Sequence, residues 1–191
     1  MAGSARYTAL LDANVLYPAF LRDVLLSLAH ADLYSAKWTL TIEQEWTAAL
    51  LRDFPGKEPT VRQIAANMRE AVPDCMVTGY EALIEGIVLP DPDDRHVVAG
   101  AIAGHADAIV TCNAKHFPKD VLATHGIDVQ SPDEFVVNQI MLHKLRSITA
   151  LKRMRERWQR PEVSAADLID LFDRRGMPVA AGALKDAVGL L

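Results

Sequence analysis

Short apolar runs that alternate with helical patterns are the feature that most constrains the fold of this chain. The run Tyr7 to Leu11 is brief and rich in aliphatic residues, which is typical of a buried strand. The runs Ala108 to Thr111 and Ile127 to Val129 repeat the pattern, and segments with helical periodicity separate them. Strands that alternate with helices favour a parallel sheet with right-handed crossovers. We therefore predict an α/β protein with a three-layer α/β/α architecture, a parallel sheet in the middle and helices on both faces.

The helical segments suggest how the chain is divided. A second helix is expected to begin near Glu43, with Thr41 as its N-cap. After Ser131, another expected N-cap, the pattern is helical to about Trp158, breaks at Pro161, and continues in a helix that ends at Gly176. We predict an α/β domain over residues 1–138 and a helical C-terminal extension over residues 139–191.

Composition excludes several classes of protein. Of the 191 residues, 50% are hydrophobic and 24% are charged, which permits a sizeable core and argues against extensive disorder. Cys75 and Cys112 have neither disulfide-framework spacing nor a close pair that would bind zinc, and a reducing cytoplasm fits them best. The most apolar stretch is interrupted by His105 and Asp107, so we expect no membrane insertion and no membrane partner.

Charge is distributed unevenly along the chain. The formal net charge is -5, yet seven basic residues and one acid lie between Lys144 and Arg160, which leaves 13 basic and 24 acidic residues elsewhere. Such asymmetry indicates a basic face on an acidic body. The basic segment could follow RNA phosphates, with Trp158 stacking on an unpaired base, or it could equally be a solvated helix face.

Acidic residues come at the positions where a parallel sheet binds ligands. Asp12 directly follows the first strand, Asp94 opens a helix and Glu45 lies one turn into the second helix. Each of the last two also has an ordinary structural interpretation, as a cap or a solvated helix residue. Asp12 does not, because a carboxylate beside an apolar strand is costly to desolvate unless a cation accompanies it. The three together predict a site for a hard divalent ion, Mg²⁺ or Mn²⁺.

Four segments carry a resemblance to a known family. They are LLDANVLYP, TIEQEW, DPDDRHVVAGAIAGHADAIVTCNAKHFP and GIDVQSPDEF, and they cover nearly all of residues 7–137. With these segments in this order, the chain resembles the PIN domain family, specifically the larger VapC-type toxins of bacterial toxin-antitoxin modules. The resemblance implies a metal-dependent endoribonuclease and assigns the conserved acids to Asp12, Glu45 and Asp94, with Asn14 as a polar residue beside the first of them.

One position departs from the family pattern. Many PIN domains have a fourth acid where this chain has Asn113. Asparagine can bind a metal or a bridging water through its carbonyl oxygen, but it adds no negative charge. Either the metal is bound less tightly, with a second metal in question, or Asp107 or Asp93 compensates.

Neighbours of these motifs are expected to support the site. Thr111 would hold it by hydrogen bonding, and Arg95 and Lys115 would contact a scissile phosphate. His96 and His116 also lie nearby, but oxygen donors suit this chemistry, and we expect neither histidine to be a ligand.

The leading functional hypothesis is a VapC-like endoribonuclease that cuts structured RNA, with transfer RNA as one candidate. The family implies a cognate antitoxin that covers the acidic groove, and a homodimer. A second hypothesis, motivated by Asn113, is a catalytically impaired PIN fold that binds RNA or protein. A third is a phosphatase with Asp12 as nucleophile, which Asn14 disfavours because a second aspartate is expected there.

Overall fold

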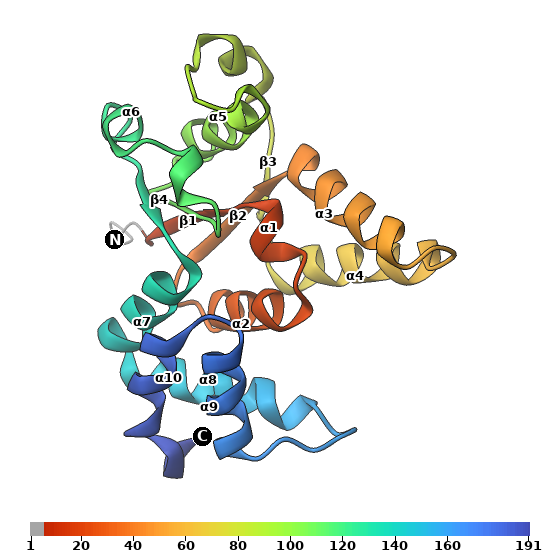
Figure 1. Cartoon of the computed structure of the whole chain (residues 1–191), viewed down its shortest axis with the longest axis vertical. Helices are drawn as coiled ribbons and strands as arrows, with labels where there is room; N and C mark the ends of the chain where they lie inside the picture. The colour runs from red at the N-terminus through yellow and green to blue at the C-terminus, as the bar shows by residue number, and fades with distance from the viewer. Residues whose placement is uncertain (1–5) are drawn as a thin grey trace.

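The first strand, β1 (Thr8–Leu11), is the central strand of a parallel sheet. The computed structural model describes residues 6–191. Its five strands lie in the order β3-β2-β1-β4-β5, and every pairing is parallel (Figure 1). This confirms the predicted α/β class with a parallel sheet. The strands are β1 (Thr8–Leu11), β2 (Ser35–Thr39), β3 (Met76–Val77), β4 (Ala108–Val110) and β5 (Asp128–Gln130).

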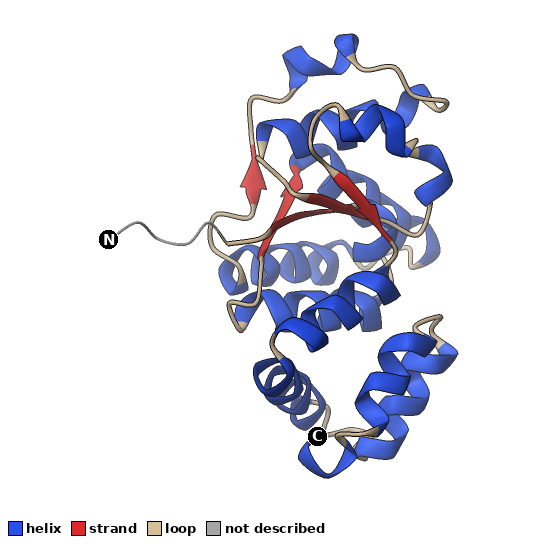
Figure 2. Ribbon diagram, turned by 90° about the vertical axis from the view of Figure 1, so that its left-hand side faces the viewer, coloured by secondary structure: helices blue, strands red, loops and turns tan. Residues whose placement is uncertain are grey.

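Helices cover both faces of the sheet, as Figure 2 shows. In Figure 1, α5 lies on one side of the sheet, and α2 and α7 lie on the other. This arrangement confirms the predicted three layers. The helices of the body are α1 (Ala13–Leu16), α2 (Ala19–His30), α3 (Leu40–Asp53), α4 (Glu58–Ala71), α5 (Arg95–Ala103) and α6 (Lys119–Ala123), with 3-10 turns η1 (Glu81–Gly86), η2 (Pro92–Asp94) and η3 (Ala114–His116).

The start of α3 differs from the prediction. Its N-cap is Thr39, whose hydroxyl accepts a hydrogen bond from the Ile42 amide at 3.1 Å. Thr41 instead shares a hydrogen bond with the Tyr80 hydroxyl at 2.6 Å, so the prediction that Thr41 caps this helix was wrong. Threonine is a favoured N-cap residue, so the sequence permits either one as the cap. The helix begins after Thr39 because β2 ends at that residue.

Helix α5 packs unusually close to the sheet. A Cβ atom added at Gly100 would lie 2.6 Å from Cγ2 of Thr39 and 3.4 Å from Cδ1 of Leu10. Only glycine permits this approach. The contact fixes α5 over the ends of β1 and β2, and with it the acidic turn from which α5 begins.

The C-terminal extension is helical, as predicted. It consists of α7 (Pro132–Leu142), α8 (Lys144–Arg157), α9 (Ala165–Arg174), α10 (Pro178–Lys185) and the 3-10 turn η4 (Val188–Leu190). Ser131 caps α7 in a capping box with Glu134, which confirms that expectation. The predicted boundary after residue 138 falls within α7 and stays a prediction. Between residues 6 and 191, no helix has both the length and the apolar character needed to cross a bilayer.

The basic segment forms α8, which packs on α2. Trp158 lies 6.0 Å from Phe20 between ring centroids, and its indole nitrogen donates to Asp23 at 2.8 Å. Arg157 donates to the same carboxylate at 2.6 Å. Trp158 is therefore engaged within the protein, and its stacking on an RNA base stays a prediction.

Candidate metal centre

Asp12 lies at the carboxyl end of β1, where the strand turns into α1. Its backbone amide still donates to the Val110 carbonyl at 3.1 Å, so the sheet fixes its position. Its residue surface is only 5% exposed. The carboxylate caps α1 by accepting from the Ala13 amide at 2.6 Å and also accepts from the Thr111 hydroxyl at 2.7 Å.

Asn14 and Thr111 hold this carboxylate in place. The Asn14 amide donates to Asp12 at 2.5 Å and to the Thr111 hydroxyl at 3.0 Å, while its carbonyl accepts from the Cys112 amide at 2.9 Å. Thr111 is fully buried and in turn accepts from the Asn113 amide at 3.0 Å. Both residues lie beside the first acid, as predicted, and the burial of Thr111 favours support of Asp12 over direct contact with a substrate.

The electrostatics at Asp12 are unfavourable for its charge. Burial raises the pKa of Asp12, and the negative charges of Asp94 and Glu45 raise it further, whereas hydrogen bonds from Thr111 and Ala13 act in the opposite direction. Asp94 and Glu45, the other two acids predicted from the sequence, thus lie close enough to Asp12 to affect its ionisation. A buried carboxylate with acidic neighbours is the setting in which a bound cation relieves the most repulsion.

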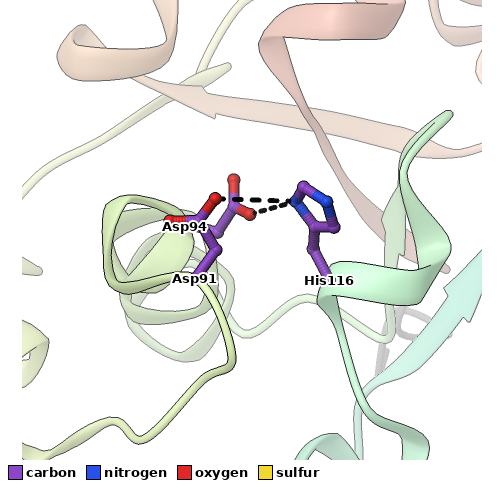
Figure 3. Close-up of side chains that lie close together, drawn as sticks. All are labelled: Asp91, Asp94 and His116. Carbon is purple, nitrogen blue, oxygen red and sulfur yellow. Dashed lines mark hydrogen bonds and ion pairs between the residues drawn. The ribbon is translucent and has the colours of Figure 1, made fainter.

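Asp94 forms part of a cluster that the sequence did not reveal. Nδ1 of His116 lies 2.7 Å from Oδ2 of Asp94 and 3.9 Å from Oδ2 of Asp91 (Figure 3). One possible ligand atom from each of the three residues lies within 4.8 Å of the other two. Asp91 comes from the N-cap of η2, Asp94 from the start of α5 and His116 from η3.

Glu45 projects from α3 and is also paired with a histidine. Its side chain is 43% exposed, and its Oε1 lies 2.8 Å from Nε2 of His96. The other nitrogen of that ring, Nδ1, is buried without a hydrogen-bond partner. Glu43, two residues earlier, has a different role, because it is buried and forms an ion pair with Arg69.

The remaining predicted residues have varied placements. Asn113 and Lys115 are exposed on the segment that leads to His116. Arg95 is partly buried next to Asp94, and its Nε has no hydrogen-bond partner. Asp107 accepts from the Thr8 amide at 2.7 Å, at the edge of the sheet where β1 and β4 begin. Asp107 therefore cannot compensate for Asn113, and that suggestion was wrong.

The donor set fits a divalent cation. In the described part of the chain, no lysine or arginine forms an ion pair with Asp12, Glu45, Asp91 or Asp94, and histidines are the only basic partners of the last three. Carboxylates suit magnesium and manganese, and imidazole suits the transition metals. Asp91, Asp94 and His116 are consequently able to hold such an ion, with Asp12 and Glu45 near this cluster.

Comparison with known proteins identifies the family of this chain. Residues 8–115 match the PIN domain, and residues 132–186 match the VapC50 C-terminal domain. The protein named "Putative ribonuclease VapC50" from Mycobacterium tuberculosis (strain ATCC 25618 / H37Rv) is 33% identical over 92 residues, which cover 48% of this chain and 54% of the relative. This match thus spans about half the length of either protein. No solved structure matches the chain. Because the PIN domain match takes in more than half of its residues, this chain belongs to the PIN domain family.

Proposed function

We propose that the protein is a divalent-metal-dependent endoribonuclease that hydrolyses RNA phosphodiester bonds, and that it is the toxin of a VapBC-type toxin-antitoxin system. The observation that carries the proposal is that Asp94 and Glu45 lie near the buried Asp12. The charges of these two acids raise the pKa of Asp12. Membership of the PIN family and the name of the mycobacterial relative support a nuclease.

Each residue has a proposed part in the reaction. Asp12, Asp94 and Glu45 are the catalytic acids and hold the metal. The metal, Mg²⁺ or Mn²⁺, would orient and activate water and stabilise charge on the phosphate. Thr111 and Asn14 fix Asp12 through their hydrogen bonds. This rigid support matters because a site that is loose by about 1 Å loses much of its activity.

Other residues are proposed to act on the substrate side. The exposed Lys115 and Asn113 lie on the segment between Thr111 and His116, from which Lys115 can reach a phosphate in solvent. Arg95, with an unpartnered Nε, is the second candidate for a phosphate contact. Asn113 would contribute through its carbonyl oxygen, as a metal ligand or as the holder of a bridging water.

The partners follow from the family and are part of the proposal. The substrate would be structured RNA, with transfer RNA as one candidate. A cognate antitoxin would cover the acidic centre, where an arginine can pair with the carboxylates. We further propose a homodimer and a cytoplasmic location.

The first experiment is a cleavage assay with end mapping. Purified protein would be incubated with total bacterial RNA in Mg²⁺, Mn²⁺ or EDTA, and new RNA ends would be located by sequencing. Asp12→Asn and Asp94→Asn proteins serve as matched controls, since each removes one charge and almost no volume. We expect discrete ends in metal, none in EDTA, and at least a roughly 100-fold lower rate in either variant.

Two other outcomes are informative. Equal cleavage by folded Asp12→Asn protein would overturn the site assignment. If antitoxin-free protein produces no ends in any metal yet retains RNA in a binding assay, the impaired binding module becomes the better hypothesis, with Asn113 as the residue to restore to aspartate.

A further inference from the structure

His116 is the one histidine in the cluster that it forms with Asp91 and Asp94. Its Nδ1 faces Oδ2 of Asp94 at 2.7 Å and Oδ2 of Asp91 at 3.9 Å. Figure 3 shows the imidazole pointing from η3 directly toward the two aspartates, which come from the opposite loop. Its side chain is 29% exposed, compared with 24% for Asp94 and 44% for Asp91, so the cluster lies open to ions at the surface.

The backbone holds this histidine in place. Its amide donates to the Asn113 carbonyl at 2.9 Å, and the Asn113 amide donates to the buried Thr111 hydroxyl at 3.0 Å. Phe117, the next residue, is almost fully buried at 1% exposure. The turn is thus anchored on both sides, by the residue that supports Asp12 and by the core.

The two separations from Nδ1 of His116 are compatible with a single ion. Two ligands of one ion can be no farther apart than twice the bond length, about 4.2 Å for bonds near 2.1 Å. Both distances from Nδ1 fall below that limit.

From this arrangement we propose that His116 is a metal ligand, which binds through Nδ1 together with Asp91 and Asp94. The proposal rests on the metal centre of the proposed function and deepens it. Mg²⁺ strongly prefers oxygen donors, whereas imidazole suits transition metals, among which Mn²⁺ also accepts carboxylates. The centre should consequently bind Mn²⁺ more tightly than Mg²⁺, and His116 should account for most of that preference.

A spectroscopic experiment separates ligation from simple support of Asp94. Full-length protein would be titrated with Mn²⁺ and followed by electron paramagnetic resonance, and electron spin-echo modulation would detect ¹⁴N bound to the ion. The variants are His116→Ala, His116→Asp and, as a matched control, His125→Ala, because His125 is an exposed histidine outside the cluster. The Mg²⁺ concentration that displaces half of the Mn²⁺ gives the metal preference.

We expect ¹⁴N modulation in the wild type and in His125→Ala, and none in His116→Ala, where Mn²⁺ affinity should fall at least about tenfold. His116→Asp should restore Mn²⁺ binding without ¹⁴N modulation and should narrow the preference over Mg²⁺. Modulation that persists in His116→Ala, or its absence from Mn²⁺-loaded wild type, would overturn the proposal.

The measurement does not depend on cleavage. If Mn²⁺ has a nitrogen ligand but the protein cuts no RNA, the proposed metal site is supported and the proposed nuclease activity is contradicted. If the protein cuts RNA but its Mn²⁺ shows no nitrogen ligand, the nuclease activity is supported and ligation by His116 is contradicted.

Discussion

Asp12 is held in position by hydrogen bonds, whereas its burial and two acidic neighbours leave its charge poorly compensated. Four hydrogen-bond contacts with Ala13, Asn14, Thr111 and the sheet fix the residue, while burial and two acids oppose its ionisation. Function-bearing groups commonly reduce the stability of the metal-free fold in this way. The cost should therefore be measurable in stability as well as in catalysis.

The Asp12→Asn variant tests this cost. Because the pKa of Asp12 is raised in the folded state, its contribution to stability is fully present below the unfolded pKa, about 3.9, and is lost as pH rises through the raised folded pKa. Asparagine does not titrate. In EDTA, the free energy of unfolding of Asp12→Asn relative to wild type should therefore increase between pH 4 and pH 8.

Guanidinium denaturation at both pH values gives the comparison, in which the fixed cost of exchanging an oxygen for an amide nitrogen cancels. A difference that is constant with pH would show that Asp12 titrates normally. Added Mn²⁺ should stabilise the wild type and leave Asp12→Asn nearly unchanged.

Thr111 provides a second test at the same carboxylate. Its hydroxyl lowers the pKa of Asp12, so Thr111→Val should raise that pKa further and move the acidic limb of the pH–rate profile to higher pH. The rate should then fall more at pH 6 than at pH 8, and Thr111→Ser should restore the wild-type profile. An equal loss at both pH values would indicate damage to the fold or to metal binding instead.

The site residues differ in how far the sequence could reveal them. Asp12, Asn14 and Thr111 were predictable because residues at the carboxyl ends of parallel strands converge. His116 was not, because it meets Asp94 across 22 residues of chain, through a turn whose path depends on the burial of Phe117. No local spacing encodes that contact.

At the level of elements, the fit of α5 on the sheet depends on one residue. Gly100→Ala would improve helix propensity by about 1 kcal/mol, but its methyl group would lie 2.6 Å from Cγ2 of Thr39, the buried N-cap of α3. Overpacking should win, with a net destabilisation of about 1–2 kcal/mol. Gly182→Ala in α10 is the matched control, since nothing lies within 4 Å of its added Cβ and the substitution should be neutral or stabilising.

Chemical denaturation of both variants tests the close packing of α5, and equal stability of the two would refute it. A second consequence is functional. Because Asp94 opens α5, any shift of the helix in Gly100→Ala should also weaken Mn²⁺ binding, which Gly182→Ala should leave intact.

Elements with strong periodicity were predictable, and short or neutral ones were not. The apolar runs around β1, β4 and β5 were identified to within a residue or so. In contrast, β2 has the sequence SAKWT, in which a lysine interrupts a short run, and it is a strand because β1 and β3 pair with it on either side. Helix α10 also escaped prediction, since its small residues, PVAAGALK, give little helical contrast until they pack on α7 and α9.

At the scale of the whole molecule, α2 joins the body to the extension. Phe20 contacts Trp158 and lies 5.2 Å from Phe172 between ring centroids, in an edge-to-face arrangement, and Asp23 accepts hydrogen bonds from both Arg157 and Trp158. These contacts link the PIN fold to two helices of the C-terminal segment. They imply that the two parts unfold together rather than as separate units.

Trp158→Ala tests both this coupling and the suggested role of Trp158 in base stacking. Loss of the aromatic contact and of the bond to Asp23 should cost about 2–3 kcal/mol, less than the roughly 3–5 kcal/mol of a fully buried site because Trp158 is only half-buried. Thermal unfolding should remain a single transition at a lower temperature. Arg160→Ala, at an exposed position two residues away, should change stability little and controls for the local loss of bulk.

Below its unfolding temperature, Trp158→Ala protein should cut RNA at close to the wild-type rate. Wild-type stability combined with weakened RNA binding would instead mean that Trp158 leaves its contact with Phe20 to meet the RNA.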